Sequence, residues 1–257
     1  MDTWRFIDTR ENTGEQNMRF DEMLAQSLVE GRGRPTVRIF RWKPWAISLG
    51  YNQDARDLDV ERCSREGIDV VRRPTGGRAI LHAEELTYSV VMFSGRKSVL
   101  QVYNDISRAL VRGLALFGVD VALQKSQPDF REQYRQASSV PCFTSSARYE
   151  IEWRGRKLVG SAQRRFSDGV RDVVLQHGSI LCGPAHRRLA DYLAIENPAV
   201  VERIRRDMEA KTVDLAELTG RRVDPGELGF ALRRGFELEW ELTFEDAGVE
   251  LRELFPA

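Results

Sequence analysis

The sequence has little cysteine or histidine, no excess of charge of either sign and no long apolar run. Its 257 residues include three cysteines and three histidines, and 39 Lys and Arg balance 39 Asp and Glu. Zero net charge disfavours a nucleic-acid-binding protein, because neutralised phosphates supply most of the affinity of such proteins. About eighteen consecutive apolar residues would be needed to span a membrane, and the N-terminus also lacks the apolar region of a secretory signal. We therefore expect a cytoplasmic protein with neither a nucleic-acid nor a membrane partner.

The few cysteines and histidines show no metal-binding or disulfide pattern. The cysteines are Cys63, Cys142 and Cys182, and the histidines are His82, His177 and His186. Without a CxxC pair or an HxxxH spacing, neither a zinc site nor a disulfide framework is indicated. The GxxxxGK[ST] and GxGxxG loops of nucleotide-binding proteins are missing as well. We expect no metal and no cofactor.

Apolar periodicity predicts interspersed helices and strands in a single domain over 1–257. The predicted helices cover 20–28, 102–117, 185–193, 198–208 and 225–236. The predicted strands cover 37–41, 46–50, 68–72, 79–82, 86–93, 149–153, 156–160, 173–176, 179–181 and 238–243. Several hairpins favour an α/β fold in the broad sense (mixed α+β), with mixed, largely antiparallel sheets flanked by helices. The portion over about 184–236 is predicted to be helical.

Two adjacent glycines lie between predicted strands in the segment RRPTGGRAILH. Gly76 and Gly77 leave backbone N–H groups uncovered, and such an array can bind a phosphate, a carbonyl oxygen or an oxyanion. Arg72, Arg73 and Arg78 would add positive charge. An isolated Gly-Gly pair is more often a plain hairpin turn, so the glycines alone are weak evidence for a site.

Cys142 lies in a polar, turn-prone segment, PCFTSSARYE, and not in an apolar run. A thiol there can be accessible, whereas Cys63 and Cys182 match the usual buried, structural cysteine. A free thiol titrates near pH ~8.5, so a nucleophile needs a cation, a base or backbone dipoles nearby. Cys142 is the candidate nucleophile, although a structural role remains the commoner one.

The segment GRKLVGSAQ follows a predicted two-residue turn at 154–155. Lys157 opens the second arm of this hairpin, and a desolvated lysine could polarise a carbonyl or assist proton transfer. Most lysines are simply solvated. The small residues Gly160, Ser161 and Ala162 would let an acyl tail pass closely. His177, in QHGS, is a possible hydrogen-bond partner, although a lone histidine is more often structural.

Five motifs in the same order resemble the biotin/lipoate protein ligase superfamily, and most of all its LipM-type octanoyltransferase branch. They are RRPTGGRAILH, EELTYSVV, PCF, GRKLVGSAQRR and LQHGSIL, within a resemblance that extends from about Phe6 to KTVDLAELTGR. The resemblance implies that octanoyl passes from the phosphopantetheine thioester of acyl carrier protein to a cysteine. It then passes to a lysine of the glycine cleavage H protein or of a lipoyl domain.

The resemblance also implies a set of site residues. The nucleophile of the family falls on Cys142 and the motif lysine on Lys157, either as a base or as an oxyanion stabiliser. The implied substrate-binding residues are Arg73, Thr75, Gly76, Gly77, Arg78, His82, Gly160, Ser161, Ala162, Gln163, His177 and Gly178. Covalent capture would split a reaction between two large proteins into two sequential dockings.

Other functions fit parts of the same pattern. An ATP-dependent lipoate–protein ligase uses the same scaffold, but it needs no cysteine and often has a third glycine in the loop. An amidotransferase between two carrier proteins would be hard to distinguish. A non-catalytic acyl-carrier-binding or regulatory protein is disfavoured because Cys142, Lys157 and the glycine pair are intact.

Two positions depart from the family pattern, and two basic pairs are open to interpretation. Ala83 stands where relatives commonly carry Asp, and Ser146 where they often carry Pro, which affects loop geometry and not the chemistry. The pairs at 164–165 and 187–188 could dock acidic carrier proteins, but solvated surface charge is the ordinary interpretation.

Overall fold

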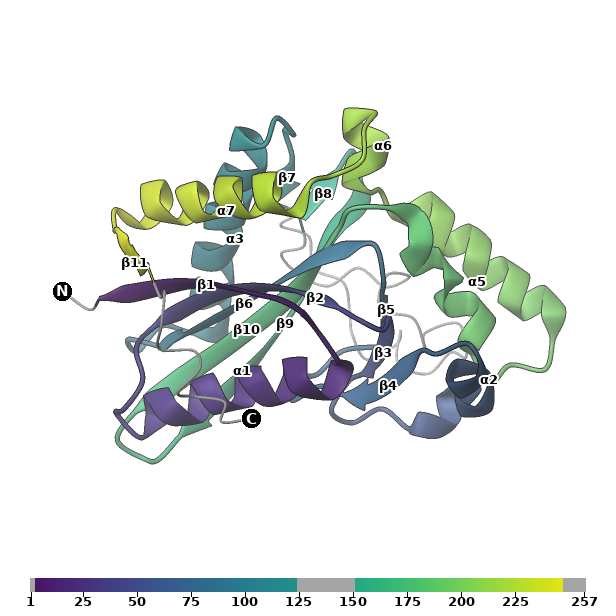
Figure 1. Cartoon of the computed structure of the whole chain (residues 1–257), viewed down its shortest axis with the longest axis horizontal. Coiled ribbons are helices and arrows are strands. Elements are labelled where there is room, and N and C mark those ends of the chain that lie inside the picture. The colour runs from purple at the N-terminus through teal and green to yellow at the C-terminus, as the bar shows by residue number, and fades with distance from the viewer. Residues whose placement is uncertain (1–2, 124–150, 247–257) are drawn as a thin grey trace.

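Two β-sheets and the helices around them make up the computed structural model, which describes residues 3–123 and 151–246 (Figure 1). The strands are β1 (Trp4–Asn12), β2 (Thr36–Trp42), β3 (Ala46–Leu49), β4 (Asp69–Arg72), β5 (Ile80–His82), β6 (Glu85–Phe93), β7 (Ala122–Leu123), β8 (Ile151–Trp153), β9 (Arg156–Ser167), β10 (Asp172–Leu181) and β11 (Phe244–Asp246). The α-helices are α1 (Gly14–Val29), α2 (Val60–Arg65), α3 (Val99–Leu116), α5 (Pro198–Lys211), α6 (Leu215–Thr219) and α7 (Pro225–Trp240). The 3-10 helices are η1 (Ala55–Asp57) and η4 (Pro184–Tyr192).

The larger sheet is mixed and mostly antiparallel, as the sequence predicts. Within the described residues its order is β11-β1-β2-β6-β10-β9-β8-β7, and the smaller sheet is β4-β3-β5. Among the strand pairs that the structure describes in the larger sheet, only those of β1 with β2 and with β11 are parallel. Helix α1 covers one face of this sheet, and α3 and α7 cover the other (Figure 1).

Local sequence signals explain where the long helices begin. Thr13 and Gln16 form a capping box before α1, and Ser98 and Gln101 form another before α3. Asp224 caps α7, and Pro225 at its first position has no N–H to leave unpaired. These caps satisfy N–H groups that the helices themselves leave free, so the helix starts are encoded locally.

The face covered by α3 and α7 is an apolar core, and the two helices approach closely there. Val90 of β6 packs with Leu110 of α3 and Phe236 of α7 in one buried cluster. A Cβ on Gly235 would overlap the backbone nitrogen of Gly113 and lie 2.6 Å from the carbonyl oxygen of Ala109. Because Gly113 and Gly235 have no side chains, α3 and α7 can pack closely where they cross.

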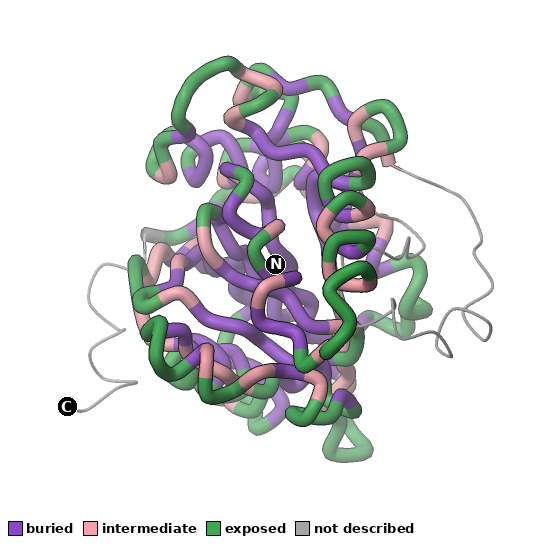
Figure 2. The backbone as a smooth tube through the Cα atoms, turned by 90° about the vertical axis from the view of Figure 1, so that its right-hand side faces the viewer, coloured by how far each residue is buried: buried purple, intermediate pink, exposed green. Residues whose placement is uncertain are grey.

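The smaller sheet has its own apolar cluster, formed with α2, η4 and α5. Ile47 of β3 and Leu81 of β5 pack there with Leu189 of η4 and Met208 of α5. Figure 2 shows buried residues following the strands through the centre, while exposed residues follow the outer sides of the helices. No helix in the described ranges has the length and hydropathy required to cross a bilayer.

The structure corrects several predicted elements. Strand β1 was not predicted, the strands at 173–176 and 179–181 are one strand, and β9 continues beyond 160 to Ser167. The helix at 185–193 is a 3-10 helix. The strand at 238–243 is wrong, because α7 continues to Trp240, whose ring packs on Phe236 one turn earlier and on Trp4 of β1. Part of the strand at 149–153 lies outside the described residues.

Candidate functional site

The loop between β4 and β5 carries the Gly-Gly pair and lies where the two sheets meet. The buried guanidinium of Arg73 holds this loop closed by donating to Gly76 O (2.9 Å), Arg78 O (2.7 Å) and Ser48 O (2.9 Å). Gly77 has a φ of 98°, which glycine adopts without strain. A Cβ at Gly76 would meet none of the described residues within 4 Å, so this part of the loop is not packed against them.

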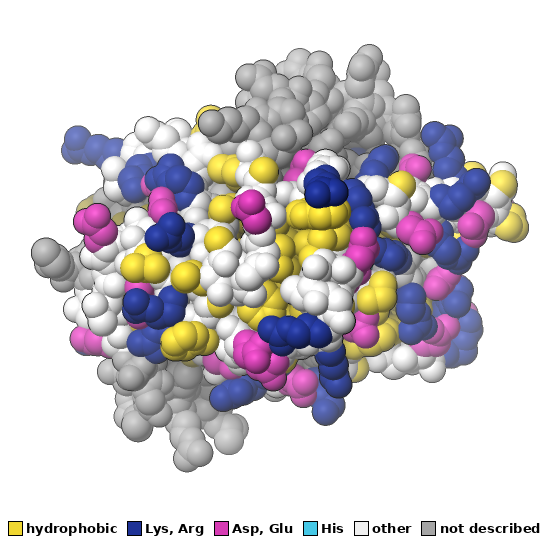
Figure 3. Space-filling view, turned by 90° about the horizontal axis from the view of Figure 1, so that it is seen from above, with side chains coloured by type: hydrophobic (Ala, Val, Ile, Leu, Met, Phe, Trp, Pro, Cys, Tyr) yellow, Lys and Arg dark blue, Asp and Glu magenta, His cyan; other side chains and the backbone are white. Residues whose placement is uncertain are grey.

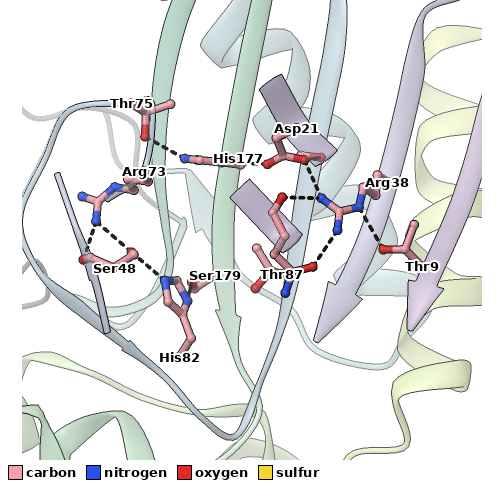
Figure 4. Close-up of polar contacts among 12 residues, drawn as sticks. Thr9, Asp21, Arg38, Ser48, Arg73, Thr75, His82, Thr87, His177 and Ser179 are labelled. Atoms are coloured by element: carbon pink, nitrogen blue, oxygen red, sulfur yellow. Dashed lines mark hydrogen bonds and ion pairs between the residues drawn. The ribbon is translucent and has the colours of Figure 1, made fainter. Parts of the chain in front are cut away.

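A chain of buried polar contacts anchors the loop to the larger sheet (Figure 4). Thr75 Oγ1, directly before the glycines, lies 2.6 Å from Nε2 of His177 on β10. Nδ1 of His177 lies 3.0 Å from Oδ2 of Asp21 on α1, and Arg38 of β2 donates to Asp21 Oδ1 at 2.7 Å. Thr75, Asp21 and Arg38 have no exposed surface, and His177 is 5% exposed.

Burial and the neighbouring charges determine the protonation states of Asp21 and His177 in these polar contacts. Burial raises the pKa of Asp21, but the charge of Arg38 and hydrogen bonds from His177 and Ser89 outweigh it and hold the pKa below its usual value. Burial lowers the pKa of His177, and Asp21 only partly offsets this. His177 is therefore neutral near pH 7, with Nδ1–H donating to Asp21 and Nε2 accepting the hydroxyl of Thr75. The buried hydroxyl of Thr75 serves to position the loop.

A second buried network lies beneath the same loop. Ser48 Oγ contacts both Arg73 Nη1 (3.0 Å) and Nε2 of His82 (2.7 Å). Nδ1 of His82 lies 2.8 Å from Oε1 of Glu85, which also accepts a hydrogen bond from Ser179 at 2.8 Å. The indole of Trp42 stacks on His82 at 3.9 Å between ring centroids. His82, predicted to bind substrate, is buried, and it contacts Ser48, which in turn contacts the guanidinium of Arg73.

The small residues of β9 divide between the two faces of the sheet. In the register with β10, Ala162 pairs with His177 and Gly160 with Ser179, both of which belong to the polar networks. Ser161 and Gln163 point the other way, toward α3. Ser161 Oγ lies 2.7 Å from Tyr88 OH, and the predicted site residue Gln163 donates to Gln176 Oε1 at 3.0 Å.

Close backbone packing continues at Gly178, whose Cβ would overlap the carbonyl oxygen of Gly160. Tyr103 OH of α3 donates to the carbonyl oxygen of Ser161 at 2.7 Å. Burial raises the pKa of Tyr88 to about 12, so its phenol stays neutral. Gly178, Ser161 and Gln163 are thus joined to the α3 side, while Thr75, His177 and Arg73 lie together on the α1 side.

Lys157 is not a solvated hairpin lysine, because only 4% of its surface is exposed. It stands opposite Glu152 in the β8–β9 pair, and its carbonyl accepts the N–H of Val213 at 3.0 Å. Glu152 is also buried. Burial raises the pKa of Glu152 and the charge of Lys157 opposes that rise, which indicates a direct electrostatic interaction between them.

The predicted nucleophile, Cys142, lies outside the described residues. The two described cysteines are poor nucleophiles. Burial raises the pKa of the Cys63 thiol, and burial next to Glu85 raises the pKa of Cys182 to about 12. Neither thiol ionises near neutral pH, which agrees with the structural role predicted for both.

The basic pairs make contacts within the protein. Arg164 lies between the rings of Tyr51 and Phe166 and donates to Pro74 O, and Arg165 pairs with Asp172. In the second pair, Arg187 contacts Asp214 and Glu217, and Arg188 contacts Glu66. Figure 3 shows basic and acidic side chains interspersed over the upper face, with no large area of one sign.

The sequence motifs do not include Asp21, Arg38 or Glu152. Asp21 lies on the amphipathic helix α1, whereas Arg38 and Glu152 are charged residues within strands. Arg38 lies among Val37, Ile39 and Phe40, all of them buried. A charge inside such a run is the signal that could have identified it, since unpaired charges are seldom buried.

Comparisons with known proteins agree with this architecture. Residues 13–237 match the lipoyl protein ligase A/B catalytic domain. Octanoyltransferase LipM of Geobacillus kaustophilus is 38% identical over 251 residues, which cover 95% of this chain and 88% of the relative. The LipM of Kyrpidia tusciae is 40% identical over 241 residues, covering 92% and 86%. A lipoate-protein ligase A crystallised with ATP superposes with a TM-score of 0.75 at 21% identity, over 99% of this chain and 92% of the ligase, which supports the predicted fold class.

Proposed function

The chain belongs to the lipoyl protein ligase A/B catalytic domain family, and on that basis we propose that it transfers octanoyl from acyl carrier protein, through Cys142, to a lysine of a lipoyl-carrier protein. The observation that carries the proposal is the identity of 38% with an octanoyltransferase over 95% of the chain. The family and the acyltransferase class indicated by the five motifs are thereby confirmed. The acceptor is the glycine cleavage H protein or a lipoyl domain.

The reaction has two steps that balance without ATP. The Cys142 thiolate attacks the carbonyl carbon of the donor thioester, and the phosphopantetheine thiolate leaves and takes up a proton. The neutral ε-amine of the acceptor lysine then attacks the acyl-cysteine. An amide forms, the carbon–sulfur bond breaks, and the amine proton passes to the sulfur of Cys142. Covalent capture lets the two carrier proteins dock in turn.

The described residues supply groups suited to both tetrahedral intermediates. Gly76 and Gly77 lie in a loop that Arg73 and Thr75 hold in place, and their backbone N–H groups are the donors that we assign to the oxyanion. Preorganised donors of this kind stabilise an oxyanion without reorganising. Lys157 brings a buried amine on β9, and the small residues Gly160 and Ala162 would let an acyl tail pass closely along the same strand.

The nucleophile is tested by acylation without ATP. Incubation with octanoyl-acyl carrier protein should add one octanoyl mass to the enzyme at Cys142, seen by intact-mass analysis and peptide mapping. Cys142→Ala should abolish the adduct. Cys63→Ala and Cys182→Ala should leave it intact, because neither thiol ionises near neutral pH. An adduct that survives Cys142→Ala would overturn this assignment.

The role of Lys157 is tested by Lys157→Ala, which should slow transfer about 100-fold or more if a positioned charge or proton donor is lost. Lys43→Ala is the matched control, because the Lys43 side chain is 76% exposed and pairs with Glu11 on the surface. Normal turnover of Lys157→Ala would remove Lys157 from the mechanism.

An ATP-dependent lipoate–protein ligase is the second candidate, favoured by the TM-score of 0.75 with such an enzyme. Octanoate with ATP would then support modification of the acceptor, and octanoyl-acyl carrier protein would not. An amidotransferase would instead take octanoyl from an octanoylated H protein. Three parallel reactions, one with each donor, distinguish these activities.

We also propose that the chain acts as one catalytic domain. Leu215 of α6 and Leu228 and Phe236 of α7 belong to the same buried cluster as Val90 of β6. The helices of the C-terminal portion therefore complete the core of the sheet that carries the site.

A further inference from the structure

Strand β9 changes its register against β8 at Leu158. Ile151 pairs with Val159, but the next residue of β8, Glu152, pairs with Lys157. One extra residue, Leu158, thus lies on β9, which is the arrangement of a β-bulge.

The bulge decides which face of the sheet Lys157 occupies. Side chains alternate along a regular strand, so Lys157 would share the face of Val159, which packs in the apolar core with α3. Instead, Leu158 and Val159 both belong to that core, with 0% and 1% exposure. The extra residue therefore turns Lys157 to the opposite face, together with Gly160 and Ala162.

The same shift places Glu152 directly opposite Lys157. Side chains of directly opposed residues have Cβ atoms about 5 Å apart in an antiparallel pair. Both residues are less than 10% exposed, Glu152 at 8% and Lys157 at 4%, so water screens their charges little. A carboxylate so near favours the charged form of an amine.

Other charged groups near this point are engaged elsewhere. The charged groups on the elements around Lys157 include His177 of β10, His186 and Arg187 of η4, Lys211 and Asp214 beside Thr212, Glu217 of α6, and Arg156 of β9 itself. Within the described residues, Arg156 pairs with Glu217 at 2.5 Å, and Arg187 lies 3.6 Å from Asp214. Lys211 lies 3.7 Å from Asp207. Within the described residues, Glu152 is the carboxylate that stands directly opposite Lys157 in the strand register.

We propose that Glu152 is a positioning residue that keeps Lys157 protonated, so that Lys157 acts in octanoyl transfer as a fixed cation and not as a base. The inference rests on the proposed function and refines it. The acceptor amine loses its first proton to solvent before it attacks, and its second passes to the sulfur of Cys142. Lys157 begins and ends each cycle as an ammonium group.

The test is the pH dependence of single-turnover octanoylation of Cys142, measured from pH 6 to 10 in Glu152→Gln and in the unchanged enzyme. The glutamine keeps the shape of the side chain and removes its charge. If Lys157 acts as a fixed cation, the fall in rate at alkaline pH should begin at a lower pH in Glu152→Gln. At those alkaline pH values Glu152→Gln should react about tenfold more slowly than the unchanged enzyme. Glu152→Asp, which keeps the charge, should restore most of the rate.

Two outcomes would overturn the inference. A pH profile unchanged in Glu152→Gln would show that Glu152 has no effect on Lys157. A faster reaction of Glu152→Gln near pH 7 would show that Lys157 works as a neutral base, since removing the carboxylate favours the free amine. Glu209→Gln on the exposed side of α5 is the matched control and should leave the profile unchanged. Circular dichroism of each variant establishes that it folds.

A separate measurement distinguishes this inference from the proposed function. Competitive labelling with acetic anhydride, followed by peptide mass analysis, reports the fraction of Lys157 present as free amine without any turnover. Lys157 should react about tenfold more at pH 8 in Glu152→Gln than in the unchanged protein. Equal labelling would overturn the role of Glu152. Failure of the unchanged enzyme to acquire octanoyl would instead overturn the proposed function and leave the labelling result standing.

Discussion

The two faces of the larger sheet differ in the interactions that hold their helices in place. The face under α3 and α7 is mainly apolar, and residues such as Leu110 and Val90 make van der Waals contacts in its buried cluster. The face under α1 also has an apolar cluster, to which Leu28 and Val91 belong, but it contains in addition a buried chain of Arg38, Asp21 and His177 that ends at the Gly-Gly loop. Apolar packing gains free energy in proportion to area and tolerates exchange, whereas a buried charge depends on one partner. Both faces therefore gain stability from apolar packing, and the polar chain on the α1 face also positions the Gly-Gly loop.

The largest expected effect on stability comes from breaking the polar chain. Asp21→Ala leaves the guanidinium of Arg38 buried without its carboxylate, which should lower the free energy of unfolding by about 3–5 kcal/mol. Urea unfolding followed by tryptophan fluorescence measures this. Replacing both partners, Asp21→Ala with Arg38→Met, should cost less than Asp21→Ala alone. If Asp21→Ala lowered the free energy of unfolding no more than the exposed control Asp54→Ala does, the two faces would not differ in this respect.

The pH dependence of stability should come from the polar regions, because the apolar face has few groups that titrate. Burial lowers the pKa of His186 from 6.5 to about 4, so the folded protein binds this proton less readily than the unfolded chain does. This contribution is present above pH 6.5 and is lost as the pH falls toward 4, by about 3 kcal/mol. His186→Gln, whose side chain does not titrate, should flatten the measured curve over that range. An unchanged slope would show that His186 is accessible to protons in the folded state.

On the apolar face the sensitive point is a backbone contact. Gly235→Ala would place a Cβ against the backbone of Gly113, and α3 and α7 would have to separate, at a cost of about 1–3 kcal/mol. Gly226→Ala, in the first turn of the same helix, meets only a side-chain oxygen of Asp224 and is the matched control. Thermal unfolding of both variants checks this, and equal midpoints would disprove the close-packing argument.

The smallest expected effects on stability come from one conservative substitution on each face, and the two variants should differ in octanoyl transfer. Thr75→Val keeps the volume but removes the hydroxyl that binds His177, which should cost about 1 kcal/mol and slow octanoyl transfer. Leu110→Met is a volume-conserving change in the apolar core and should cost less than about 1.5 kcal/mol with transfer unchanged. Parallel transfer assays and unfolding curves measure both. Equal transfer rates would mean that the polar chain does not position the loop.

Most long elements could be predicted because their signals are local. The helices α1 and α3 have an apolar stripe and a capping box, and β6 is a continuous β-rich run. Strand β1 was missed because its sequence, WRFIDTREN, is rich in polar residues and its parallel partner β11 lies at the other end of the chain. The end of α7 was misjudged because apolar residues at 238–243 fit a strand as well as a helix.

The candidate site could be predicted in part. The motifs identified Thr75, the glycines and His177, which the structure brings together, and Lys157, which it buries. They did not reveal that Ser161 and Gln163 face α3 or that Arg73 is used to close its own loop. Asp21 was also missed, because its partners Arg38 and His177 come from distant strands.

The sequence by itself determined the family, the periodicity of the long helices, and the order of the residues that carry chemistry. Only the tertiary structure decided which of those residues share a face. Strand register is a property of two strands, and one extra residue at Leu158 reverses the direction in which Lys157 points. The burial of Asp21 with Arg38 is decided in the same way, because a charge can be buried only where the fold supplies its partner.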